Sequence, residues 1–200
     1  MRSAWASASP TSRARALALL LVTVAVLLGA GPAGAKVYAS QQEALQAAFP
    51  EADRIERRNF VLTPEQVERI EQRSRAPLDS RIVTLHVGWR GGEVLGYALI
   101  DIHTVRTLPE ALMTVLEPEG SVRSVRVLAF HEPEDYLPPR RWFEQFEARR
   151  LDSNLRLRRG VHAISGATLS AQATTRSVRR ALALHETLLA GKPALQSAAE

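Results

Sequence analysis

Two stretches in the first half of the chain combine helical spacing of hydrophobic residues with a helix-start signal. Ser40 is followed three residues later by Glu43, which makes a capping box, and apolar residues dominate 44–49 before Pro50. A second capping box, with proline at the first helical position, opens the segment 63–73. The pattern predicts a short helix followed by an amphipathic one.

The middle of the chain alternates apolar runs with turn residues, which is typical of β-hairpins. Residues 81–89 and 94–105 flank an Arg-Gly-Gly turn, and residues 112–116 and 122–130 flank the sequence Glu-Pro-Glu-Gly. We therefore expect two hairpins in an antiparallel sheet. The charged segment 51–59 fits either a continuation of the first helix or an edge strand.

Hydrophobic residues return to helical spacing in the last third of the chain. Trp142, Phe143 and Phe146 predict a short aromatic-faced helix over 140–149, with the rings in the core. The alanine-rich segment 169–190 predicts the longest helix. Strands with helices at both ends favour an α+β fold, in which an antiparallel sheet of two hairpins is flanked by helices and a long C-terminal helix follows.

The N-terminal segment has the pattern of a signal peptide. Three arginines precede an unbroken apolar run over 16–28, and Ala33-Gly34-Ala35 is a small-x-small cleavage pattern. We therefore expect a signal peptide over 1–35, a single domain over 36–200, and a periplasmic location. An uncleaved leader that anchors the protein in the membrane is the alternative, although the run is short for a membrane span.

The amino-acid composition excludes several classes of cofactor, catalysis and partner. The chain has no cysteine, which excludes disulfides, thiolate catalysis, iron–sulfur clusters and covalent c-type haem. The net charge is +5, but without the leader's three arginines 23 basic residues face 21 acidic ones. This balance does not support nucleic acid as a partner. The five histidines lack zinc-ligand spacing, so we expect no metal site.

Two further groups of charged residues have no special motif around them. Asp101 and His103 share one strand face, which we interpret as an ordinary polar face because no nucleophile accompanies them. Arg176, Arg179 and Arg180 lie on the long helix, where we expect a solvated basic face.

The segment between a strand-like stretch at 161–164 and the long helix carries small and hydroxyl-bearing residues, Ser165-Gly166-Ala167-Thr168. A helix N-terminus presents free backbone N–H groups and the positive end of the helix dipole, which favour an anionic phosphate. The glycine lets a phosphate approach the backbone, and the hydroxyls can donate to its oxygens. Plain capping is the alternative, because Ser and Thr are common helix caps.

The sequence Ser-Gly-Ala-Thr-Leu-Ser at 165–170 resembles the flavinylation motif of the FMN-binding domain family. This family includes subunits of the sodium-pumping NADH:quinone reductase and of the Rnf electron-transport complex. The resemblance extends to the strand 124–131, to the aromatic segment and to the helix after the motif, and is strongest over 121–190. The family usually has an aspartate three residues before the motif serine, where this chain has His162.

The resemblance implies FMN as the cofactor, held by a phosphoester to the Thr168 hydroxyl. A separate flavin transferase would take FMN from FAD, and the bound flavin would pass one or two electrons. Because His162 replaces the usual aspartate, we expect it to affect how the transferase recognises the motif. Phe143 and His131 are further candidate neighbours of the flavin ring. The cofactor-binding residues expected from the resemblance are Thr168, Ser165, Gly166, Ala167, Leu169, Ser170, Trp142 and Glu132.

The sequence thus leads to an exported electron carrier that exchanges electrons with a membrane redox protein, rather than to a self-contained enzyme. Two alternatives remain open. One is an exported binding module without flavin, in which the motif is only a helix cap. The other is a reductase that uses its flavin on a small substrate.

Overall fold

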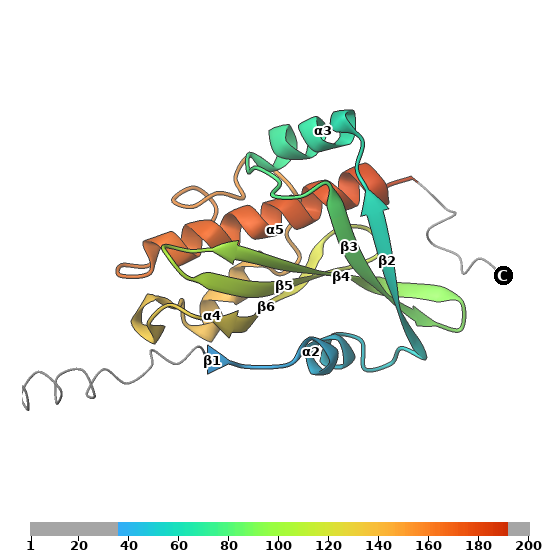
Figure 1. The fold of residues 1–200 in the computed structure, drawn as a ribbon, viewed down its shortest axis with the longest axis horizontal. Coiled ribbons are helices and arrows are strands. Elements are labelled where there is room, and N and C mark those ends of the chain that lie inside the picture. The colour runs from blue at the N-terminus through green and yellow to red at the C-terminus, as the bar shows by residue number, and fades with distance from the viewer. Residues whose placement is uncertain (1–35, 192–200) are drawn as a thin grey trace, which may run out of the picture. The chain divides into compact units, whose positions relative to one another are not determined.

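The computed structural model describes residues 36–191, and the expected signal peptide lies outside the described residues. The described part contains a six-stranded antiparallel sheet in the order β1-β6-β5-β4-β3-β2 (Figure 1). The strands are β1 (Lys36–Val37), β2 (Arg54–Val61), β3 (Ile82–Arg90), β4 (Glu93–Thr104), β5 (Pro109–Leu116) and β6 (Val122–Phe130).

Helices cover both faces of this sheet. The α-helices are α2 (Gln41–Ala48), α3 (Pro64–Ser74), α4 (Arg140–Phe143) and α5 (Thr168–Leu188), and the short 3-10 helices are η1 (Glu134–Tyr136) and η2 (Glu144–Phe146). Figure 1 shows α5 lying across one face with α3 beyond it, while α2 lies on the other side. The expected α+β fold, with a long helix after the motif, is confirmed.

The side chains of β4 alternate between the two faces of the sheet, which explains why the domain has two hydrophobic clusters. Tyr97 and Leu99 belong to the larger cluster under α5, whereas Ala98 belongs to the smaller cluster under α2. Successive side chains of a strand point to opposite faces, so each face of the sheet receives one set. Asp101 and His103, which continue the odd-numbered set, are therefore directed to the face that α5 covers.

Local sequence signals fix several element boundaries. Both capping boxes form, at Ser40 with Glu43 and at Thr63 with Gln66. Residues 54–59 of the ambiguous segment belong to the edge strand β2, which pairs with β3 in the described part of the chain. Among residues 36–191, no helix combines the length and the apolar character needed to cross a membrane.

Two expected elements are wrong in detail. The aromatic helix ends at Phe146 instead of 149, because Ala148 adopts a left-handed φ of 59° and donates its N–H to the Val122 carbonyl of the sheet. The stretch 161–164 is not a strand. Only Val161 forms an isolated bridge, with Leu157, and the residues after it are irregular.

One buried guanidinium joins α5 to the segments on either side of it. Arg179 donates from Nε to the Ser74 carbonyl at 2.6 Å and from Nη2 to the Arg73 carbonyl at 2.8 Å, at the end of α3. Its Nη1 donates to the carbonyls of Asp152 and Leu155 at 2.9 and 3.0 Å, in the loop before the motif. The solvated basic face expected for the arginines of α5 is therefore wrong for Arg179 and also for Arg180, because both are buried.

Replacing Arg179 by lysine should destabilise the fold. An ammonium group cannot reach four carbonyls on two segments, so buried acceptors lose their donors, and we expect the free energy of unfolding to fall by about 2–4 kcal/mol. Urea denaturation followed by tryptophan fluorescence measures this change. Arg176→Lys, at an exposed position on the same helix, is the matched control and should change stability by less than about 0.5 kcal/mol. Equal losses in the two variants would contradict the assigned role of Arg179.

Candidate functional site

The motif begins α5 without a capping side chain. Ala167 is the N-cap residue and provides no side-chain bond, and Thr168 is the first helical residue. The Thr168 hydroxyl donates backwards to the Ile164 carbonyl at 3.1 Å. The capping alternative therefore does not account for the motif, and the N–H groups of the first turn are left without a capping side chain.

Gly166 allows the backbone of the motif to turn, and the space beside it is open. Its φ is +84°, a left-handed conformation that favours glycine, and a Cβ built there would meet nothing within 4 Å. Ser165 is exposed beside it, whereas Ala167 is buried at the base of the turn. The backbone at this turn is therefore accessible to a ligand.

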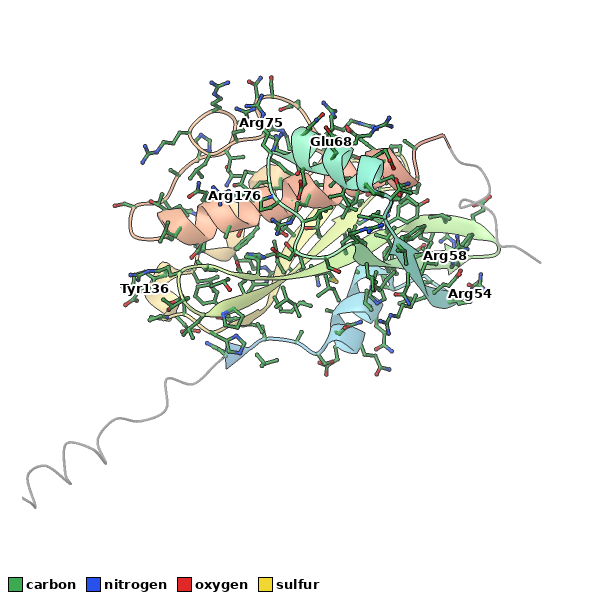
Figure 2. All side chains as sticks on the ribbon, turned by 45° about the horizontal axis from the view of Figure 1, so that its top comes forward. Arg54, Arg58, Glu68, Arg75, Tyr136 and Arg176 are labelled. Carbon is green, nitrogen blue, oxygen red and sulfur yellow. The ribbon has the colours of Figure 1, made fainter. Side chains whose placement is uncertain are left out.

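An open depression of about 310 Å³ lies over the motif. Two of the residues that form it come from distant parts of the sequence. The Arg106 guanidinium carbon lies 4.6 Å from the centre of the Tyr136 ring, a cation–π arrangement. Figure 2 shows Tyr136 at the end of the molecule where α5 begins. The residues around the depression are Arg106, Tyr136, Gly166, Thr168, Leu169 and Ser170.

Ser170 supplies a polar group at this depression that has no protein partner. Its side chain is buried, and its hydroxyl makes no hydrogen bond within the described part of the chain. A buried hydroxyl without a partner costs free energy, so it marks a place where a ligand or water can donate or accept. The positive charge of Arg106 and the helix N-terminus make an anionic oxygen the fitting ligand.

Trp142 supports the backbone that precedes the motif and does not line the depression. It is buried against Phe146, as expected for a core ring, and its Nε1 donates to the His162 carbonyl at 2.8 Å. Gln145 Oε1 accepts from the His162 N–H at 2.8 Å. These two bonds satisfy the backbone of His162, which explains why the chain there does not pair as a strand.

Glu132 also acts from a distance, through the loop between β4 and β5. Its Oε1 accepts from the N–H groups of Thr107, Leu108 and Arg106 at 2.7, 2.9 and 3.2 Å. These backbone donors lower the pKa of Glu132 below its usual range. The carboxylate thereby holds the loop that presents Arg106 to the depression.

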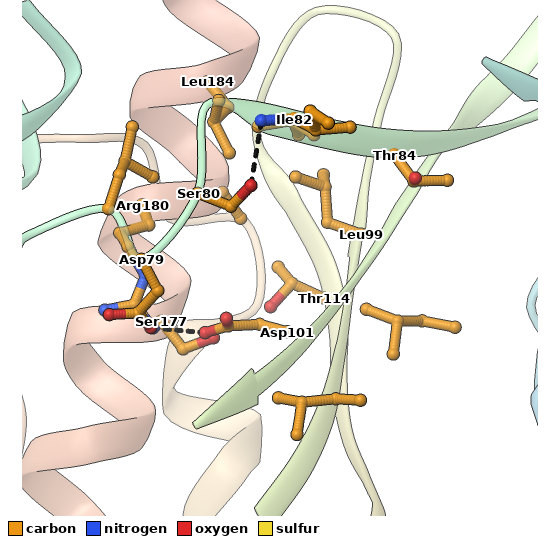
Figure 3. A pocket seen from close by; sticks show the side chains of 15 residues that line it. Asp79, Ser80, Ile82, Thr84, Leu99, Asp101, Thr114, Ser177, Arg180 and Leu184 are labelled. Atoms are coloured by element: carbon orange, nitrogen blue, oxygen red, sulfur yellow. Dashed lines mark hydrogen bonds and ion pairs between the residues drawn. The ribbon is translucent and has the colours of Figure 1, made fainter. Parts of the chain in front are cut away.

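A buried charged network lies between the sheet and α5. His103 Nε2 lies 3.0 Å from Glu110 Oε2, and His103 Nδ1 lies 3.3 Å from Asp101 Oδ2. Arg180 of α5 bonds the same Asp101 oxygen (Figure 3). The expectation that Asp101 and His103 form an ordinary polar face is therefore wrong, because α5 covers that face.

The pKa values in this network follow from its charges. Burial alone would lower the pKa of His103, but the carboxylates of Asp101 and Glu110 outweigh it and raise that pKa to about 9. Burial opposes ionisation of Asp101 too, yet His103 and Arg180 lower the pKa of Asp101 well below its usual range. His103 is therefore protonated and Asp101 ionised at neutral pH.

A second hollow lies beside the network. It has a volume of about 200 Å³ between the loop 78–80, β3, β4 and α5, and Figure 3 shows Asp101 and Arg180 at its polar end, with Ile82, Leu99 and Leu184 among its apolar walls. No group of three or more His, Cys, Asp or Glu side chains within residues 36–191 has a geometry that could hold a metal ion.

The sequence located the depression but not everything that forms it. Thr168, Leu169, Ser170 and Gly166 come together there, while Ser165 and Ala167 adjoin it in the chain and Trp142 and Glu132 lie behind it. Arg106 and Tyr136 were missed, since neither belongs to a motif. Nothing in their local sequence signals that the loop between β4 and β5, η1 and α5 meet at this point.

His103→Gln should change how stability depends on pH. The folded-state pKa of about 9 lies above the ordinary value, so the contribution of His103 is complete below about pH 6.5 and is lost as pH rises to 9. The free-energy difference between wild type and variant should therefore shrink over this window, by an amount on the order of 3 kcal/mol. Urea denaturation at pH 6 to 9.5 measures it, and parallel profiles for the two proteins would rule out the role assigned to His103.

Comparison with known protein families gives a match in the second half of the chain. Residues 109–183 match the model of the FMN-binding domain. No curated protein matches the chain. The matched segment runs from the start of β5 into α5 and contains the whole motif, together with Glu132 and Trp142. This segment of the chain is therefore similar to the FMN-binding domain, and the resemblance that its motif indicates is confirmed.

Proposed function

We propose that this protein is an exported electron carrier whose FMN is attached by a phosphoester to the Thr168 hydroxyl. The observation that supports it best is the motif depression, where Thr168 stands beside an uncapped helix N-terminus, the partnerless Ser170 hydroxyl and the Arg106 guanidinium. These groups suit an oxygen-rich anion bonded to the threonine. The match to the FMN-binding domain supports flavin as the group that carries this anion.

In this proposal each side chain has a limited task. Attachment would form a bond between Thr168 Oγ1 and phosphorus and break the bond between the FMN phosphorus and AMP in FAD, so that AMP would leave and the hydroxyl proton would pass to solvent. Arg106 would balance the negative charge that remains on the phosphodiester. The Ser170 hydroxyl and the first N–H groups of α5 would be available to donate to its oxygens. When bound, FMN supplies transfer of one or two electrons.

The chain contributes positioning rather than chemistry of its own. Glu132 holds the loop of Arg106, and Trp142 and Gln145 hold the backbone that leads into the motif. Attachment therefore requires a separate flavin transferase, and the electrons come from or go to a membrane redox protein. The proposed site of action is the periplasm, reached through the signal peptide.

Intact mass of the protein, purified after periplasmic co-expression with a flavin transferase, tests the attachment. Wild type should gain the mass of FMN less one water. Thr168→Val, which keeps the shape of the side chain and removes the hydroxyl, should lose the adduct completely, whereas Thr168→Ser should retain it in part because a hydroxyl remains.

Other results of the same experiment are equally informative. If flavin co-purifies without added mass, FMN binding stands and the covalent bond is wrong. A colourless wild-type protein without added mass would reject the carrier in favour of an exported binding module. An adduct that persists in Thr168→Val would move the attachment to another residue.

The departure at His162 gives a second prediction. Its side chain is exposed, while its backbone is held by Trp142 and Gln145, so a substitution there leaves the turn in place. Because the resemblance indicates an aspartate at this position, His162→Asp should raise the flavinylated fraction several-fold under limiting transferase. His162→Asn is the matched neutral control and should stay near wild type. A higher fraction in both variants would show that charge is not the cause.

A further inference from the structure

The part of the sequence around the motif carries positive charge only. From Ser153 to His185 there are six arginines and no aspartate or glutamate. Three of these arginines lie within Arg156–Arg159, in the loop that leads to the motif. Any carboxylate that neutralises this region must therefore belong to another segment of the chain.

The buried Arg179 gathers arginines from two segments. It bonds the carbonyls of Arg73 and Ser74 on one side and those of Asp152 and Leu155 on the other. The residues that follow these two pairs are Arg75 and Arg156. Figure 2 shows Arg75 next to the irregular loop that precedes α5. We call Arg75, Arg156 and Arg159 the arginine cluster.

No carboxylate within residues 36–191 forms an ion pair with the cluster. Arg156 Nε is buried, and no group in the described part of the chain bonds to it. Burial and the charges of Arg75 and Arg159 lower the pKa of Arg156, which agrees with positive charges held close together. Such a cluster costs stability in the free protein.

The loop presents these charges from a fixed backbone. The Asn154 carbonyl accepts from the N–H groups of Arg156 and Gly160, both at 2.7 Å, and the Arg156 carbonyl accepts from Val161 at 3.0 Å. Arg158 sits between them at a left-handed φ of 64° and donates its N–H to the Val161 carbonyl at 2.8 Å. A rigid charged surface loses little entropy when a partner docks.

We propose that the arginine cluster is the docking surface for a partner protein with an acidic patch. Guanidinium groups that lack intramolecular partners suit carboxylates, which they bind in a forked geometry. A lipid surface fits less well, because the large exposed hydrophobic side chains of the described residues all lie outside 149–161. The same loop continues along the chain into the motif, while the cluster itself lies near Arg179 in the middle of α5. That the docking serves electron exchange rests on the proposed function, whereas the docking itself needs no flavin.

Binding of fluorescein-labelled poly-L-glutamate to the purified protein, followed by fluorescence anisotropy, tests this surface. The triple variant Arg75→Gln/Arg156→Gln/Arg159→Gln should bind about tenfold more weakly at low salt and show a smaller salt dependence. The matched control is Arg57→Gln/Arg126→Gln/Arg141→Gln, which removes the same charge from exposed positions outside the cluster and should stay within about threefold. Flavin-free and flavinylated protein should bind alike.

Several other outcomes would overturn the docking proposal. Equal weakening in the two triple variants would mean that only net charge matters. Binding to phosphatidylglycerol vesicles but not to poly-L-glutamate would make the cluster a lipid site. Competition by inorganic phosphate beyond that of chloride at equal ionic strength would indicate a small-anion site. If the cluster variant fails to fold, the single exposed change Arg159→Gln replaces it, and unchanged affinity there rejects the proposal. A colourless protein that still binds poly-L-glutamate would reject the carrier function alone.

Discussion

The four carbonyl bonds of the buried Arg179 guanidinium are the interaction on which the arrangement of this domain depends. They connect the middle of α5 to the end of α3 and to the loop before the motif. A charged donor can be buried at acceptable cost only where its hydrogen bonds are satisfied, so the three segments must take one relative position. The start of α5, and with it Thr168, is placed on the sheet by this requirement together with the apolar core beneath the helix.

The motif end of α5 differs in kind from its middle. In the middle, Arg180 and Asp101 meet and His103 is held between two carboxylates, so the buried charges are compensated. At the motif end, the helix has no capping side chain and the Ser170 hydroxyl has no partner. The Thr174 and Ser177 hydroxyls in the middle of α5 lack partners among the described residues as the Ser170 hydroxyl does, so the two ends differ in that the charges of the middle are compensated, whereas the first N–H groups at the motif end have no capping side chain. This contrast is what a site for an external anionic group requires.

The supporting residues share a common way of acting. Glu132, Trp142 and Gln145 each bond backbone groups of the two loops that meet at Thr168, and none of them lines the depression. Their substitution would therefore act on the position of the motif and of Arg106 before it acted on any bound group. In the proposed electron carrier, in which the cofactor would supply the chemistry, holding the proposed attachment point in place would be the main task of the protein.

Local signals in the sequence determined the boundaries of several helices, the two hairpins and the position of the motif. The two capping boxes, the two hairpins, the long helix after the motif and the motif itself are all properties of neighbouring residues, and the structure agrees with them. Tertiary structure alone decided the burial of Arg179, the charged network of Asp101 and His103, and the meeting of Arg106 and Tyr136 with Thr168. Those features join residues that lie far apart in the chain. The periodicity of one segment reports which side of it is apolar, but not which other segment covers that side.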